Sequence, residues 1–372
     1  MSKCYLCGTE LIDTNVSEEH IILNALGGRY KSKKLLCKKC NNSTGCEYDA
    51  VLANQYHFLT NMLGLDLERG KTPPVNMNAD DGHTYTIKSG MTPELSHPIV
   101  INEKLDEKTI ALSITARSKK ELEDILSKYK KKGYDINIEE SLEKAVYSKE
   151  PAPQMHSKLT FGGIESFPAI LKMAVSQYID KTDDIENVKS AIEDINHPGK
   201  DFSTFNKVEL CVLEKNIFEE DDNEVLHSIL LCASKEKHKL YAIIQLFSTQ
   251  QYIVKLSNTY NGSDFTDLMI YDVLKKDFKN KTIHWTPDFD YIFNYEYPKA
   301  HVNYEIMQGR FARVMKIAQE NQNERLKNKI IEEVTEKVMK KVEELVNQVD
   351  YPTQEEINQM CNELLDELLP KD

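Results

Sequence analysis

The 372-residue chain is long enough for two or three domains, each with its own hydrophobic core. Its 40% hydrophobic and 29% charged residues are typical of a globular protein, and no apolar run reaches the roughly 20 residues that a bilayer-spanning helix needs. A formal net charge of −13 argues against a protein that binds nucleic acid over its whole surface. Because the N-terminus lacks the pattern of a secretion signal, we expect a cytoplasmic protein with no membrane partner.

Two closely spaced cysteine pairs lie near the start of the chain. Cys4 and Cys7 form one Cys-x2-Cys knuckle, and Cys37 and Cys40 form the other. Each knuckle presents two thiolates from one tight turn, and two knuckles supply the four ligands of a tetrahedral zinc ion. Four thiolates leave no open coordination position, so the sequence predicts a structural zinc site. The isolated cysteines are expected to be small buried side chains: Cys46, Cys211, Cys232 and Cys361.

A second group of residues lies between and just after the knuckles. The acidic-His segment at Glu19-His20 is followed by two isoleucines and by the pair Gly27-Gly28, and Asn41 comes directly after the last cysteine of the second knuckle. This combination resembles the HNH endonuclease family over about the first 60 of the 372 residues. The resemblance implies a ββα fold, in which a β-hairpin and a helix hold one divalent metal ion.

The resemblance also implies a role for each matched residue. Glu19 and Asn41 correspond to the metal ligands and His20 to the general base, with Mg²⁺ or Mn²⁺ as the catalytic ion. Carboxylate and amide oxygens suit such an ion, and a neutral imidazole can take a proton from water. The family's middle asparagine falls at Ser32. Because successive strand residues point to opposite faces, either the strand is bent at Glu19 and His20, or Glu18 is the carboxylate on the face of His20.

Basic side chains are concentrated between Gly27 and Cys40. This stretch contains six basic residues and no acidic one, which makes a local cationic patch on an acidic chain. Such a patch attracts phosphates and makes binding salt-dependent. The sequence therefore predicts contact with nucleic acid, with DNA as the favoured substrate, through Arg29, Lys31, Lys33, Lys34, Lys38 and Lys39.

The next part of the chain contains weaker signals. Apolar spacing predicts a helix over residues 46–63, and a run rich in turn residues predicts a linker at 67–92. The alternating segment 109–115, a capped helix that begins at Ser118 and the segment 134–138 together predict a β-α-β unit.

The second half of the chain contains one more helix, several strands and a helical tail. A helix is predicted at 166–179, and everything after residue 302 has helical periodicity. The tail carries a long apolar stripe that packs on its own domain or, less favoured, joins two copies of the chain. Short polar connections between the last three of four strand-like segments predict an antiparallel meander. These segments are 207–213, 226–233, 239–247 and 251–257.

Taken together, the sequence predicts an α+β protein in which a zinc-stapled HNH module is followed by a mixed α/β region and a helical tail. The predicted regions are the module at 1–66, the linker at 67–92, the mixed region at 93–300 and the helical region at 301–372. The predicted activity is metal-dependent cleavage of nucleic acid. By analogy with HNH proteins of antiphage defence, residues 93–372 would bind a protein partner or small-molecule activator, or form a homo-oligomer, and thereby gate the nuclease. The alternative is a non-catalytic zinc adaptor that binds nucleic acid or protein.

Overall fold

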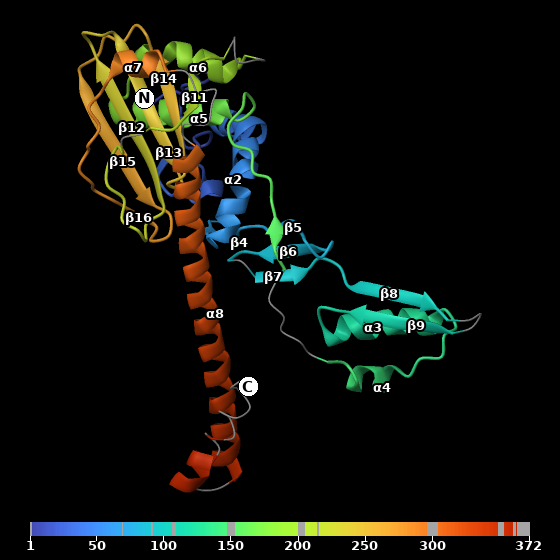
Figure 1. The fold of residues 1–372 in the computed structure, drawn as a ribbon. Helices are drawn as coiled ribbons and strands as arrows, with labels where there is room; N and C mark the ends of the chain where they lie inside the picture. Colours follow the sequence, from blue (N-terminus) through green and yellow to red (C-terminus); the bar gives the residue numbers. More distant parts are fainter. Residues whose placement is uncertain are drawn as a thin grey trace. The chain divides into compact units, whose positions relative to one another are not determined.

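The structure is a computed structural model that describes residues 2–68, 70–90, 92–105, 109–146, 153–199, 205–213, 216–295, 304–348, 353–359 and 362 (Figure 1). The chain divides into two compact units, Met1–Ile317 and Ala318–Asp372. Within the described ranges, no helix combines the length and the apolar character needed to cross a bilayer.

The first residues form a small module built from a short hairpin and a long helical segment. The loop between the strands of the hairpin approaches itself closely at Gly28, where an added Cβ would lie 2.0 Å from the carbonyl oxygen of Ile22, so only glycine fits. The two strands of the hairpin are antiparallel. The helical segment runs from Lys38 to Met62 without leaving the helical conformation, and its middle part, Gly45–Asp49, is a π-turn. The elements are β1 (Glu19–His20), η1 (Asn24–Leu26), β2 (Lys31–Ser32), α1 (Lys38–Thr44), the π-turn η2 (Gly45–Asp49) and α2 (Ala50–Met62).

Residues 66–156 form small sheets and two helices. The segment expected to be a linker, 67–92, contains paired strands instead, because its turn residues connect short strands. The expected strand at 109–115 and the helix after Ser118 are present, and Ser118 caps that helix by accepting from the Glu121 N–H. The expected strand at 134–138 is wrong: β9 pairs antiparallel with the preceding β8, and residue 138 begins a helix. The elements are β3 (Asp66–Leu67), β4 (Gly70–Lys71), β5 (Val75–Ala79), β6 (Thr84–Lys88), β7 (Thr92–Leu95), β8 (Ile99–Lys104), β9 (Ile110–Thr115), α3 (Lys119–Lys131), α4 (Ile138–Glu143) and β10 (Met155–His156).

A six-stranded antiparallel sheet is the largest element of the first unit. Its strand order is β11-β14-β13-β12-β15-β16, so the meander expected from the last three of the four strand-like segments is confirmed. The sequence interpretation missed the two strands that extend the sheet beyond β12. The strands are β11 (Val208–Cys211), β12 (Leu226–Ser234), β13 (Lys239–Leu246), β14 (Gln250–Ser257), β15 (Phe265–Asp272) and β16 (Asp277–Phe278).

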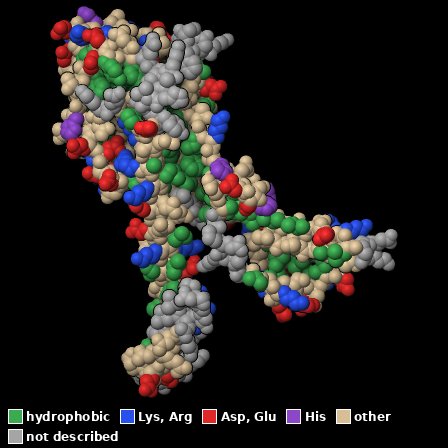
Figure 2. All heavy atoms as spheres, viewed as in Figure 1, with side chains coloured by type: hydrophobic (Ala, Val, Ile, Leu, Met, Phe, Trp, Pro, Cys, Tyr) green, Lys and Arg blue, Asp and Glu red, His purple; other side chains and the backbone are tan. Residues whose placement is uncertain are grey.

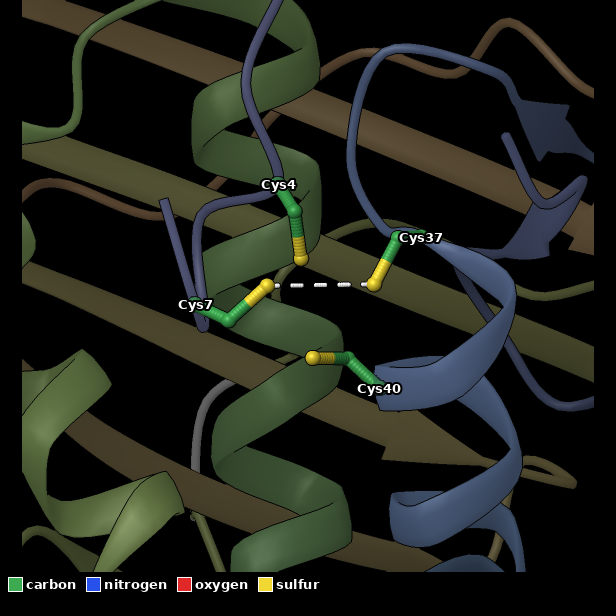
Figure 3. Close-up of side chains that lie close together, drawn as sticks. All are labelled: Cys4, Cys7, Cys37 and Cys40. Carbon is green, nitrogen blue, oxygen red and sulfur yellow. Dashed lines mark hydrogen bonds between the residues drawn. The ribbon is translucent and has the colours of Figure 1, made fainter. Parts of the chain in front are cut away.

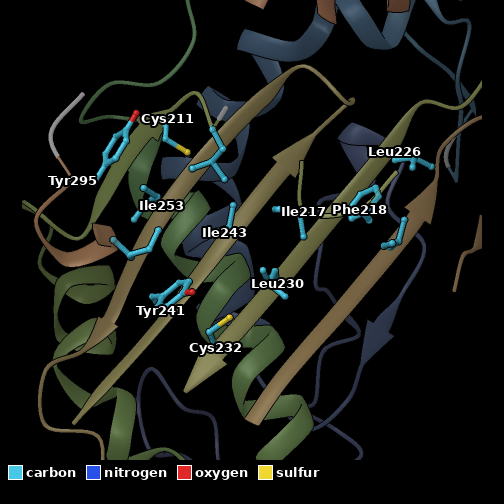
Figure 4. Close-up of a cluster of buried hydrophobic side chains, with 13 residues drawn as sticks. Cys211, Ile217, Phe218, Leu226, Leu230, Cys232, Tyr241, Ile243, Ile253 and Tyr295 are labelled. Carbon is cyan, nitrogen blue, oxygen red and sulfur yellow. The ribbon is translucent and has the colours of Figure 1, made fainter. Parts of the chain in front are cut away.

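Both faces of this sheet are covered. One face carries an apolar cluster that includes Leu230, Tyr241 and Ile243 (Figure 4). Residues around α7 (Phe289–Phe293) pack against this cluster. The helix α5 (Phe167–Thr182) contacts β11, β12, β13 and β14, and every residue from Phe167 to Ile179 is buried. Next to α5 in the chain lie η3 (Glu186–Val188) and α6 (Lys189–Asn196).

The helical tail is present as expected. Helix α8 (Tyr304–Gln348) runs from the first unit into the second, and Thr353 caps a final helical segment by accepting from the Glu356 N–H. Of the apolar stripe, Ile330 is 59% exposed and Leu326 is 40% exposed. Of the isolated cysteines, Cys211 and Cys232 are buried as expected. Cys46 is exposed, contrary to expectation, because it belongs to the π-turn Gly45–Asp49, which contains no buried residue. Cys361 lies outside the described residues. The end of the expected stripe, Val349, also lies outside them.

Candidate active site

The four knuckle cysteines come together in one cluster (Figure 3). Their Sγ atoms all lie within 4.8 Å of one another, and the Sγ atoms of Cys7 and Cys37 are 3.8 Å apart. Four sulfurs at about 2.3 Å from a tetrahedral zinc ion would be separated by about 3.8 Å. The two knuckles are held together by backbone contacts, since the Tyr5 N–H donates to the Leu35 carbonyl and Val16 forms a bridge with Cys37. The donor set and its spacing therefore fit a structural zinc ion.

Beside this cluster, the helical segment forms one wall of a pocket of about 240 Å³. Asn41, Gly45, Asp49 and Ala53 lie four residues apart along the segment, a spacing that keeps side chains on one helix face. Glycine and alanine leave room for the hollow. The π-turn Gly45–Asp49 interrupts the regular helix at this wall, and such turns are frequent at functional sites.

The rest of the pocket wall is formed by Glu19 and His20 of β1, which we call the dyad, and by residues that follow them in the chain. Glu19 and His20 both line the pocket, although they are adjacent in the strand, because β1 is only two residues long and the chain turns directly after it. The lining is completed by Leu23, Asn24, Ala25 and Ala50. The alternative carboxylate, Glu18, is half exposed and is paired with Lys31 and Lys33.

His20 lies against a carboxylate that the sequence interpretation missed. Its Nε2 atom is 3.5 Å from Oε1 of Glu68, the side chain is only 18% exposed, and among the described residues no group makes a hydrogen bond to Nε2. Burial lowers the pKa of His20, and the negative charge of Glu68 opposes this shift. The net direction is downward, so the imidazole is neutral at pH 7 and can accept a proton.

Glu19 is buried and ion-paired. Its side chain is 3% exposed, and Oε1 lies 2.8 Å from Nζ of Lys172, which also lies 2.6 Å from Oδ2 of Asp49. Burial raises the pKa of Glu19, an effect that the positive charge of Lys172 opposes. Burial alone would lower the pKa of Lys172, but the two carboxylates outweigh it and the net shift is upward. Lys172 is therefore an ammonium ion held between two acids.

The remaining matched positions have clear partners. The amide Nδ2 of Asn41 donates to Oγ of Ser17 at 2.5 Å, and no described residue donates to its Oδ1. Ser32, at the position of the family's asparagine, donates its hydroxyl proton to Asp180 of α5. This hydrogen bond ties the hairpin to α5. The group beside His20 is therefore Glu68 and not Ser32.

The basic residues are partly neutralised. Oε1 of Glu68 lies 2.8 Å from Nζ of Lys31 and 3.9 Å from Nη1 of Arg29. Two further ion pairs join Lys33 to Glu18 and Lys34 to Asp183. Lys38 donates a hydrogen bond to the Thr14 carbonyl, and Lys39 is exposed. Figure 2 shows acidic and basic side chains interspersed over the visible face. A phosphate backbone would therefore have to compete with these carboxylates for the lysines.

Three site residues were missed by sequence reasoning: Glu68, Asp49 and Lys172. Asp49 could have been found, because it lies eight residues after Asn41 on the same helix face. Lys172 gave a weaker signal as a single charge inside an otherwise apolar helical run. Glu68 gave none.

One comparison with known proteins found a match, and it lies in the N-terminal region. Residues 4–57 match the family model of the HNH endonuclease. No curated protein and no solved structure matches the chain. The matched segment contains all four cysteines, the dyad at Glu19 and His20, Asn41 and the π-turn. We conclude that the chain carries, in residues 4–57, a domain of the HNH endonuclease family with a cysteine cluster suited to zinc.

Proposed function

We propose that the protein is a metal-dependent endonuclease that hydrolyses phosphodiester bonds in nucleic acid, with DNA as the favoured substrate. One observation carries the proposal: Glu19, His20 and Asn41 line the same small pocket beside the four-cysteine cluster. A family match to residues 4–57 supports the same reading. An imidazole and two oxygen donors around one hollow are what metal-assisted attack of water on a phosphate needs.

In this proposal, His20 is the general base and its neighbours prepare it for that task. Its depressed pKa keeps the ring neutral, and the Glu68 carboxylate, 3.5 Å from Nε2, would stabilise the imidazolium that forms when the ring accepts a proton. Glu19 and Asn41 would hold Mg²⁺ or Mn²⁺, because hard ions prefer such oxygen ligands. When bound, the ion would supply positive charge for the phosphate and the leaving 3′-oxygen. The products would carry 5′-phosphates.

We further propose that residues 93–372 gate this activity, as in an antiphage-defence effector of the cytoplasm that responds to a partner protein or small molecule. The support is analogy together with one structural fact: α5, outside the matched domain, contributes Lys172 and Asp180 to the site and to its hairpin. Homo-oligomerisation through the exposed apolar side chains of α8 is part of the same proposal.

A second candidate function is a non-catalytic zinc adaptor. The ion pair between Lys172 and Glu19 favours it, because an ammonium ion already occupies one side of the candidate metal ligand. Among the described His, Cys, Asp and Glu residues, only the four cysteines cluster closely enough to hold an ion.

The test is a cleavage assay with the full chain. Plasmid DNA, single-stranded DNA and RNA are incubated with the protein and Mg²⁺ or Mn²⁺, and the His20→Ala variant should cut about 10²–10⁴-fold more slowly. His156→Ala is the control, because His156 is exposed and pairs with Asp80 away from the pocket. Equal cutting by wild type and His20→Ala would remove His20 as the base. No cutting of any substrate would favour the adaptor.

A further inference from the structure

Lys172 lies in a setting where an ammonium ion is costly without partners. It belongs to α5, its side chain is 1% exposed, and its neighbours in the helix are apolar and buried. Its oxygen contacts are Glu19 at 2.8 Å, Asp49 at 2.6 Å and the Thr44 hydroxyl at 3.4 Å. A buried charge is retained only when paired, so these contacts hold the ammonium next to Glu19 and Asp49, the two carboxylates that line the pocket.

The pocket therefore carries less negative charge than its acids suggest. Glu19 and Asp49 are both part of the lining, yet each gives one oxygen to the same ammonium ion. The other oxygen of Asp49, Oδ1, is buried and makes no hydrogen bond within the described part of the chain. Two carboxylates and one ammonium together have the net charge of a single carboxylate, which is a weak attraction for a divalent ion.

We propose that Lys172 is a positioning residue that acts through Glu19 to keep the divalent-metal affinity of the free protein low. Its ammonium group holds the Glu19 carboxylate in place and competes with a divalent cation for it. The metal ion would consequently bind firmly only when a substrate phosphate adds its own negative charge. Because α5 lies outside residues 4–57, the metal affinity of the HNH domain would be set by a different part of the chain. This inference rests on the proposed function.

The experiment measures Mn²⁺ binding without nucleic acid. Full-length, zinc-loaded protein is titrated with Mn²⁺, and free Mn²⁺ is followed by electron paramagnetic resonance. We expect Lys172→Met to bind Mn²⁺ at least about tenfold more tightly than wild type, because a buried positive charge is removed beside the ion. Asp49→Asn should bind at least about tenfold more weakly, because a negative charge is removed. Damage to the fold would weaken binding in both variants, so opposite signs identify the electrostatic role.

Two matched controls belong to the same experiment. Lys181→Met removes an exposed lysine of α5 that pairs with Asp267, and it should bind Mn²⁺ as wild type does. Glu47→Gln removes an exposed carboxylate from the π-turn and should also leave binding unchanged. Lys172→Met with wild-type zinc content but unchanged or weaker Mn²⁺ binding would overturn the proposal. Should Lys172→Met not fold, Lys172→Gln takes its place, because the amide removes the charge but keeps a polar partner for Glu19 and Asp49: tighter Mn²⁺ binding supports the proposal, and unchanged or weaker binding overturns it.

The outcomes separate this inference from the proposed function. Tighter Mn²⁺ binding by Lys172→Met, together with no cleavage by any variant, would support the inference and reject the nuclease. Cleavage that depends on His20, together with unchanged Mn²⁺ binding by Lys172→Met, would do the reverse.

Discussion

The HNH domain and the six-stranded sheet are stabilised in different ways. The domain has a hairpin with strands of two residues and a cluster of four cysteines, whereas the sheet has strands of up to nine residues with apolar side chains packed on both faces. A short segment buries little apolar surface by itself, and ligation of a zinc ion by the four cysteines would add stability. We therefore expect the part of the molecule that contains the catalytic candidates to depend most on a bound ion.

The sheet and α5 also hold the domain in place through buried polar contacts. His227 of β12 lies 2.9 Å from the carbonyl oxygen of Leu26, and the Tyr56 and Tyr252 hydroxyls are 2.7 Å apart. The Tyr5 hydroxyl lies 2.9 Å from Ser176 of α5. The larger region thus contacts the domain through its own framework, and we expect the domain to depend on zinc. Three experiments test this division.

The largest effect is expected from loss of a zinc ligand. Cys37→Ser should release about one zinc ion per chain, unfold the domain and abolish any cleavage, because zinc binding and folding of such a module are coupled. The sheet should remain folded, since its apolar cluster contains no residue of the domain. Elemental analysis gives the zinc content, and far-ultraviolet circular dichroism follows the strands.

The control is Cys46→Ser, an exposed cysteine of the same helical segment, which should keep its zinc. Complete unfolding of Cys37→Ser, sheet included, would show that the two regions are not separately stabilised.

A smaller effect concerns the pH dependence of the contact between the two regions. Burial lowers the pKa of His227 from 6.5 to about 4, a shift that the hydrogen bond to Leu26 opposes. Below pH 6.5 the unfolded chain binds this proton, and the folded chain binds it only below about 4. The contribution of neutral His227 to the stability of the folded protein is therefore complete above pH 6.5. As the pH falls from 6.5 to 4, the free energy of unfolding decreases by up to about 3 kcal/mol.

Urea unfolding at a series of pH values measures this loss. His227→Gln should remove that part of the pH dependence, while the amide can still donate a hydrogen bond. An identical slope between pH 6.5 and 4 in the variant would mean that other groups are responsible.

The smallest effect is expected at the paired tyrosines. Tyr56→Phe removes one hydroxyl and leaves the buried Tyr252 hydroxyl without its partner, which should lower the free energy of unfolding by about 1–2 kcal/mol. Tyr252→Phe should cost a similar amount. Chemical denaturation of the two single variants and the double variant forms a cycle, in which the double variant should cost less than the sum. Additive losses would show that the two hydroxyls are not energetically coupled.

Local patterns in the sequence were sufficient for much of this protein. The two knuckles predicted the four-cysteine cluster, because Cys-x2-Cys spacing alone brings two sulfurs together. Apolar periodicity predicted α5 and α8, and alternation with short connections predicted the meander. Two predictions failed for local reasons. The predicted linker at 67–92 contains short strands joined by turn residues, which give it the composition of a linker. The predicted strand at 134–138 has apolar residues, but β9 pairs with β8 instead of with this segment.

The chemistry around His20, in contrast, was decided by contacts that join distant parts of the chain. Lys172 meets Glu19 across about 150 residues, and Glu68 reaches His20 from the turn that follows β3, outside the hairpin. No spacing rule connects such positions, since their distance depends on how α5 and the sheet pack against the domain. The sequence by itself determined which residue types could bind metal and take a proton. Only the tertiary structure decided which of them are buried, how they are charged and which oxygen is already held by an ammonium ion, because burial and pairing are properties of the packed molecule.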